Sequence, residues 1–66
     1  MRITRKLLEE QLETKIEEYE TVAQLPYIHE DGWNQIETKR EYLGDRLVQV
    51  AVIYGQIDEL RNLLED

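Results

Sequence analysis

Five aliphatic residues recur at intervals of seven through the second half of the chain. They are Ile36, Leu43, Val50, Ile57 and Leu64. A repeat of seven places side chains on one face of an α-helix. Three further apolar residues fall on the same stripe, namely Leu47, Tyr54 and Leu60. The spacing therefore predicts one amphipathic helix over about residues 34–64.

A strand is the competing interpretation of part of this segment. Val48, Val50, Val52 and Tyr54 alternate with other residues, and β-branched side chains favour strands. A strand needs a partner for its backbone groups, and no second segment shows the same alternation, so the helix is favoured. Gly55 costs about 1 kcal/mol inside a helix relative to Ala, which leaves open whether the helix is continuous, bent or broken there.

The first half of the chain contains a second amphipathic pattern. Its apolar residues are spaced four, four, three and four apart, at Leu8, Leu12, Ile16, Tyr19 and Ala23. Thr4 is a suitable N-cap, and Pro26 disfavours helical geometry just before it. The pattern predicts a helix over about residues 4–24 and a connection over 25–33. The expected fold is all-α, a single antiparallel helical hairpin domain over residues 1–66.

The chain is short, and it contains no Cys. A chain of this length buries only about 60% of the surface that it exposes when unfolded, and disulfides cannot compensate. Self-association can, and two hairpins would form a four-helix bundle as a homodimer. The longer second helix would also overhang the first by roughly 15 Å at 1.5 Å per residue, which exposes the end that carries Ile57, Leu60 and Leu64.

The segment after Gly44 is apolar on two sides. Besides the stripe that faces the first helix, Gly44, Val48, Ala51 and Gly55 form a row of small residues with Val52 beside it. A helix that is apolar on two sides is buried on two sides, by a second copy or by a different protein. Two aromatic residues of the connection either anchor that interface or close the end of the bundle. The predicted partner-binding residues are Gly44, Val48, Ala51, Val52, Gly55, Ile57, Leu60, Leu64, Trp33 and Tyr27.

Fifteen acidic residues against eight basic ones give a net charge of −7. This balance disfavours direct binding to nucleic acid or to an anionic membrane, and the lack of Cys favours a cytoplasmic location. Acidic residues spaced four apart form a predicted acidic face, at Glu9, Glu13, Glu17, Glu37, Glu41 and Asp45. Such a face can steer a basic partner, imitate a nucleic-acid backbone or simply remain solvated.

Residues that carry catalysis or bind metal are scarce. The single His29 adjoins Glu30 and Asp31 in a turn, without the spacing of helical metal ligands. We therefore expect no enzyme activity, no metal and no cofactor. The sequence predicts a small acidic interaction protein, a regulator, inhibitor, adaptor or escort of bacterial or phage type. The alternatives are an acidic mimic that blocks a DNA- or RNA-binding protein, and a purely structural oligomerisation subunit.

Overall fold

The computed structural model describes residues 4–65, and every regular element in that range is a helix. The elements are α1 (Arg5–Ala23), α2 (Gly32–Thr38), α3 (Arg40–Leu43), the 3₁₀ helix η1 (Gly44–Arg46) and α4 (Leu47–Glu65). The all-α prediction is confirmed. Among the described residues, no helix combines the length and the apolar character needed to cross a lipid bilayer.

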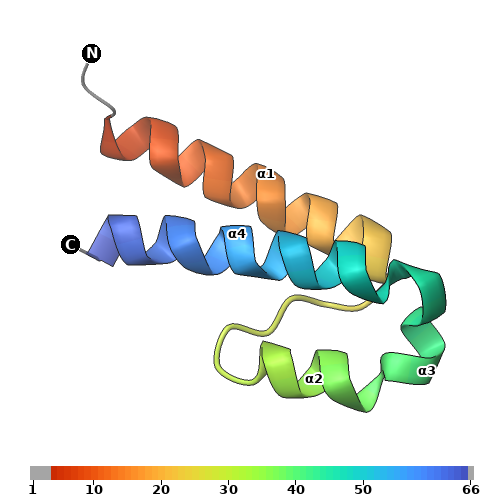
Figure 1. Ribbon diagram of the computed structural model, residues 1–66. Helices are drawn as coiled ribbons and strands as arrows, with labels where there is room; N and C mark the ends of the chain where they lie inside the picture. The colour runs from red at the N-terminus through yellow and green to blue at the C-terminus, as the bar shows by residue number, and fades with distance from the viewer. Residues whose placement is uncertain (1–3, 66) are drawn as a thin grey trace.

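Helices α1 and α4 form an antiparallel hairpin, so that the first turn of α1 and the last turn of α4 lie at the same end (Figure 1). The Thr4 hydroxyl accepts a hydrogen bond from the Leu7 N–H at 3.2 Å and caps the start of α1. Gln24 follows the last turn of α1 in a left-handed conformation (φ 56°), and the Gln24 N–H donates to the Glu20 carbonyl. The bounds of α1 agree with the predicted helix over residues 4–24.

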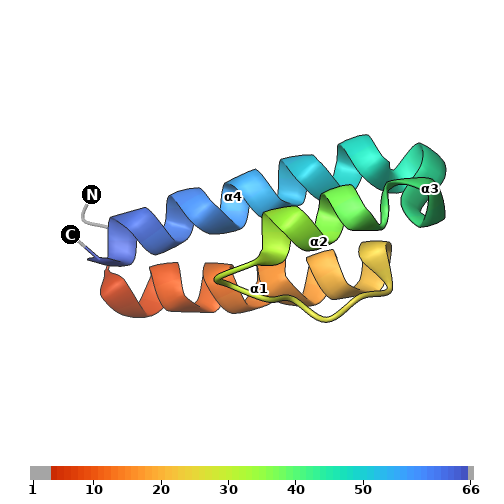
Figure 2. The same cartoon turned by 90° about the horizontal axis from the view of Figure 1, so that it is seen from below.

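The single helix predicted over residues 34–64 is wrong. The chain breaks at Gly44, where φ is +54° and ψ is −123°, and α2 folds back beside the first half of α4 (Figures 1 and 2). Gly55 lies inside α4, which continues through it. Because α1 and α4 each contain 19 residues, the predicted overhang does not exist. The fold-back instead covers the core with Ile36, which is only 2% exposed.

The core combines residues from both sides of Gly44. Its fully or almost fully buried members are Tyr19, Ala23, Ile36, Leu43, Val50, Ile53 and Ile57. Four of them belong to the repeat of seven, which therefore faces one core although the helix is broken. No charged or polar residue is buried with them in the described part of the chain, so hydrophobic burial is the main force that holds the hairpin together.

Aromatic side chains join α2 and the preceding loop to this core. The Tyr54 ring of α4 lies 6.1 Å from that of Tyr19, 6.0 Å from that of Tyr27 and 5.7 Å from that of Trp33, between centroids. The rings of Tyr19 and Tyr27 meet edge to face at 5.6 Å. These separations and tilts are typical of favourable aromatic pairs, so the cluster fixes the loop and the start of α2 against the hairpin.

Arg46 secures the turn at Gly44. Its guanidinium donates hydrogen bonds to the carbonyl oxygens of Val22, Leu43 and Tyr42, at 3.1, 3.3 and 3.1 Å, and lies 5.2 Å from the centroid of the Tyr42 ring. The Val22 carbonyl lies in the last turn of α1, where carbonyl groups have no hydrogen-bond donor inside the helix. One side chain thus joins the end of α1 to the turn that begins α4.

Burial of Tyr19 makes hairpin stability sensitive to alkaline pH. Burial and, to a lesser extent, the neighbouring Tyr54 and Tyr27 raise the pKa of Tyr19 above its ordinary value of 10.0. The raised pKa means that the folded state keeps the proton longer than the unfolded state, so the stabilisation is complete below about pH 10 and is lost as the pH rises through the folded pKa. The melting temperature of wild type should therefore fall more steeply above about pH 10 than the melting temperature of Tyr19→Phe.

The same variant tests the buried hydroxyl at neutral pH. The Tyr19 hydroxyl has no hydrogen-bond partner among the described residues, and removal of an unsatisfied buried group is close to neutral or stabilising. We expect the melting temperature of Tyr19→Phe at pH 7 to equal or exceed that of wild type. Parallel pH profiles for the two proteins would show that Tyr19 does not control the alkaline transition.

Candidate protein-binding groove

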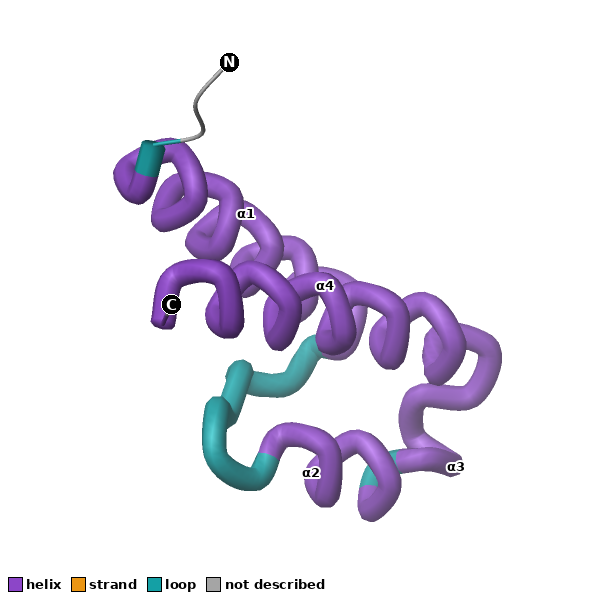
Figure 3. Tube along the Cα trace, turned by 60° about the vertical axis from the view of Figure 1, so that its left-hand side comes forward, coloured by secondary structure: helices purple, strands orange, loops and turns teal. Residues whose placement is uncertain are grey.

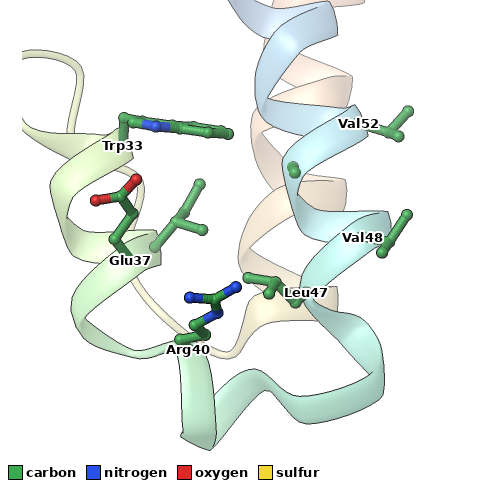
Figure 4. Close-up of a pocket in the computed structure, with 8 residues that line it drawn as sticks. Trp33, Glu37, Arg40, Leu47, Val48 and Val52 are labelled. Atoms are coloured by element: carbon green, nitrogen blue, oxygen red, sulfur yellow. The ribbon is translucent and has the colours of Figure 1, made fainter.

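A largely apolar groove of about 700 Å³ lies between α2 and the first half of α4. It is lined by Trp33, Ile36, Glu37, Arg40, Leu47, Val48, Ala51 and Val52. In Figure 4, Trp33, Glu37 and Arg40 lie along the α2 side, and the Trp33 ring extends toward α4. Val48 and Val52 stand on the far edge of α4 and point away from α2. The apolar surface thus continues from the groove over the outside of α4.

Three large apolar side chains of this surface are strongly exposed. Val48 is 73% exposed, Val52 is 55% exposed and Trp33 is 50% exposed. With typical areas for such side chains, they present on the order of 300 Å² of apolar surface to water. The largest apolar patch on a typical monomer has about this size and often has a function. We refer to these three residues, together with Ala51, as the groove face.

Two opposite charges line the same wall of the groove, Glu37 in α2 and Arg40 at the start of α3. The ion pairs found within residues 4–65 are both on α1, Arg5 with Glu9 and Lys15 with Glu18. Glu37 and Arg40 therefore form no ion pair within the described chain, and both are exposed. They remain available to polar groups of an incoming molecule.

The structure brings four of the ten predicted partner-binding residues together in this groove, namely Trp33, Val48, Ala51 and Val52. The two predicted glycines lie outside it. Gly44 forms the turn, and Gly55 is exposed farther along α4, with open space where a side chain would stand. The stripe of small residues therefore lines the groove only in its middle part.

The other predicted partner-binding residues belong elsewhere. Ile57 is fully buried against the core, because α1 reaches as far along the hairpin as α4 does. Leu60 and Leu64 are partly buried near the open end of the hairpin, beside Leu7 and Leu12 of α1 respectively. Tyr27 packs in the aromatic cluster. The prediction that the Ile57 end overhangs and awaits a partner is wrong.

The predicted acidic face is divided among three places. Glu9, Glu13 and Glu17 are exposed along α1, Glu37 lies in the groove wall, and Glu41 and Asp45 are exposed near the turn. Glu9 already accepts the Arg5 guanidinium at 3.2 Å. The acidic residues of α1 and those near the groove therefore do not form one continuous row.

Sequence reasoning missed Ile36, Leu47 and Arg40 as groove residues. Ile36 and Leu47 were assigned to the hairpin core because they lie on the stripe of seven, and each does contribute to it. Arg40 reaches the groove only because the chain turns back after α3. The one signal available in the sequence was Gly44, whose capacity for positive φ permits that reversal.

No group of three or more His, Cys, Asp or Glu side chains in the described range converges in a way that could hold a metal ion. Comparisons of the chain with protein-family models, with curated proteins and with solved structures found no match.

Proposed function

We propose that this chain is a small protein-interaction module whose groove face packs against an amphipathic helix of a basic partner protein. The observation that supports the proposal is the joint exposure of Trp33, Val48 and Val52 around one apolar groove. Burying about 300 Å² of apolar surface on these side chains would contribute roughly 7–8 kcal/mol at about 25 cal/mol per Å², from which the cost of association is subtracted. The groove lies between two helices, an arrangement that suits an apolar helix face.

Charge favours a basic partner over an acidic one. The net charge is −7, and the exposed acidic residues Glu30, Asp31 and Glu37 lie in α2 and in the loop before it. A helix with lysines along its flanks would meet opposite charge as it approached, which mainly raises the rate of association. Two copies of this chain that met through the groove would repel one another, because each carries a net charge of −7.

The proposal can be tested with an amphipathic peptide of leucine and lysine, and with its leucine and glutamate counterpart as the matched probe. Trp33 is the only Trp and lines the groove, so its emission responds to a ligand that binds there. We expect the lysine peptide to shift Trp33 emission to shorter wavelength and the glutamate peptide to bind at least about tenfold more weakly. A lysine peptide without effect on Trp33 would contradict the proposal.

Val48→Glu is expected to weaken binding of the lysine peptide by about 30-fold or more, because it places a charge where apolar surface is buried. Val48 is 73% exposed, so the helical circular-dichroism signal and the melting temperature should change little. Leu63→Glu is the matched control, since Leu63 is 53% exposed on the same helix but does not line the groove. Equal affinities for the two variants would place binding elsewhere.

The same titrations separate the two alternative functions. An acidic mimic of nucleic acid would lose its partner at high salt and in a Glu13→Lys, Glu17→Lys double variant, and would tolerate Val48→Glu. A structural subunit would self-associate through the groove as a four-helix bundle, bind neither peptide, and dissociate on Val48→Glu.

A further inference from the structure

From Gly32 to Glu65 the backbone is helical except at two residues, Lys39 and Gly44. Lys39, which separates α2 from α3, has φ −96° and ψ 20°, outside helical geometry. Its N–H still donates to the Gln35 carbonyl at 3.0 Å, and its carbonyl accepts from the Leu43 N–H at 2.9 Å, as in an α-helix. Leu43 and Leu47 on either side of η1 have ordinary helical angles. Gly44 alone in this segment has a positive φ. Rotating the φ of Gly44 from +54° to about −60° and its ψ from −123° to about −45°, with a smaller change of the Lys39 ψ from 20° to about −45°, would make the segment continuous.

The repeat of seven is compatible with both arrangements. In the folded-back chain Ile36 and Leu43 contact the same core as Val50 and Ile57. In a straight helix these four residues would lie along one face, because seven residues correspond to nearly two turns. The sequence therefore does not oppose the straight helix.

The core also divides cleanly at the same residue. Tyr19, Ala23, Ile36 and Leu43 precede Gly44, whereas Val50, Ile53 and Ile57 follow it. Helices α1 and α2, which both precede the turn, contact α4, and Figure 3 shows the loop that joins them. If the turn opens, the segment before Gly44 can make every one of these contacts with α4 of another molecule.

From these observations we infer that Gly44 is a hinge through which two copies of this chain exchange residues 4–43, each packing that segment on α4 of the other. In the exchanged dimer, residues 32–65 form a helix about 50 Å long at 1.5 Å per residue. Two such helices run antiparallel, with α1 of each chain on α4 of the other, which gives four helices around a two-fold axis near Gly44. Exchange of an identical element is a common route to dimers when a short turn can straighten.

The occupant of α4 is a second copy because only this chain carries the complementary residues. The contacts that α4 makes with the segment before Gly44, including those of Tyr54 with Tyr19, Tyr27 and Trp33, are remade without change. Contacts of Arg46 with Val22, Leu43 and Tyr42 hold the closed turn, and they are what opening must break. The groove is rebuilt from α2 of one chain and α4 of the other, so the dimer presents two grooves. The inference does not rest on the proposed function.

Two glycine-to-alanine variants test the hinge, because only one of the two glycines has positive φ. At Gly44 an alanine meets no neighbouring atom within 4 Å but is strained at φ +54°, so it disfavours the closed turn and favours the helix. At Gly55 an alanine also meets no atom, and the residue lies inside α4. Sedimentation of the full chain should show that Gly44→Ala dimerises about 100-fold more tightly than wild type, while Gly55→Ala does not.

A distance measurement separates exchange from simple association through the groove. The chain has no Cys, so spin labels can be placed on cysteines introduced at the exposed Asn34 and Asp58. Doubly labelled Gly44→Ala diluted with unlabelled Gly44→Ala reports only the distance within one chain, which should lengthen to about 36 Å in a straight helix. A monomeric Gly44→Ala, a dimer that keeps the shorter wild-type distance, or equal dimerisation by Gly55→Ala would each overturn the inference.

Discussion

Replacing Ile57 with alanine is expected to lower the free energy of unfolding by about 2–5 kcal/mol, the usual range for an aliphatic side chain removed from a core. Ile57 has no exposed surface and belongs to the seven-residue core. A single core in a chain of this size supplies only roughly 3–5 kcal/mol in total. Most Ile57→Ala molecules should therefore be unfolded at 25 °C, which urea titration followed by circular dichroism and Trp33 fluorescence would measure.

Leu63→Ala is the matched control, because Leu63 is an aliphatic residue of the same helix that is 53% exposed. Its cost should stay within about 0.5 kcal/mol, as for most surface substitutions. The two variants also show whether Ile57 is a core residue or an interface residue. If Ile57→Ala left the urea midpoint unchanged and impaired association with a partner, Ile57 would belong to an interface, as the repeat of seven by itself suggested.

The first helix could be predicted with both of its ends because its signals are local. Thr4 caps the helix with its own hydroxyl, and Pro26 follows two residues after its left-handed cap at Gln24. Each signal acts within a few residues of the boundary that it sets. No information about the rest of the molecule was needed.

The break in the second half could not be located in the same way. Gly44 and Gly55 are equally suited to end a helix, and the repeat of seven passes through both. What distinguishes them is tertiary: a turn at Gly44 lets Ile36 cover the core and Arg46 bond the end of α1. A turn at Gly55 would instead separate Ile57 from Val50. The energy that selects Gly44 therefore comes from packing between segments distant in sequence.

The same reason explains which groove residues could be predicted. Val48, Ala51 and Val52 lie on one helix, so their spacing alone places them on a common face. Trp33 was expected in an interface because it is a large aromatic residue in a loop, but its position opposite α4 depends on the fold-back. Arg40 and Glu37 enter the groove wall for the same reason. Sequence spacing thus predicted one wall of the groove, and the turn at Gly44 supplied the other.

Gly32→Ala is expected to lower the free energy of unfolding by about 1–3 kcal/mol through overpacking. A Cβ at this position would lie 2.5 Å from Cε2 of Tyr54 and 3.0 Å from its hydroxyl. The ring cannot retreat freely, because Tyr19, Tyr27 and Trp33 surround it at centroid distances of 5.7–6.1 Å. The start of α2 must then move away from α4, and Trp33 emission should shift to longer wavelength.

A double-mutant cycle with Tyr54→Leu isolates this contact. Leucine lacks the distal ring atoms and the hydroxyl, so Gly32→Ala in the Tyr54→Leu background should cost almost nothing, and a coupling of about 1–2 kcal/mol should remain. Gly55→Ala, where a Cβ meets open space, should instead stabilise the chain by roughly 0.5–1 kcal/mol through helix propensity. An equal cost of Gly32→Ala in both backgrounds would mean that Gly32 is required for its backbone conformation and not for the approach of Tyr54. The close approach of α2 to α4, and with it the depth of the groove, would then have a different cause.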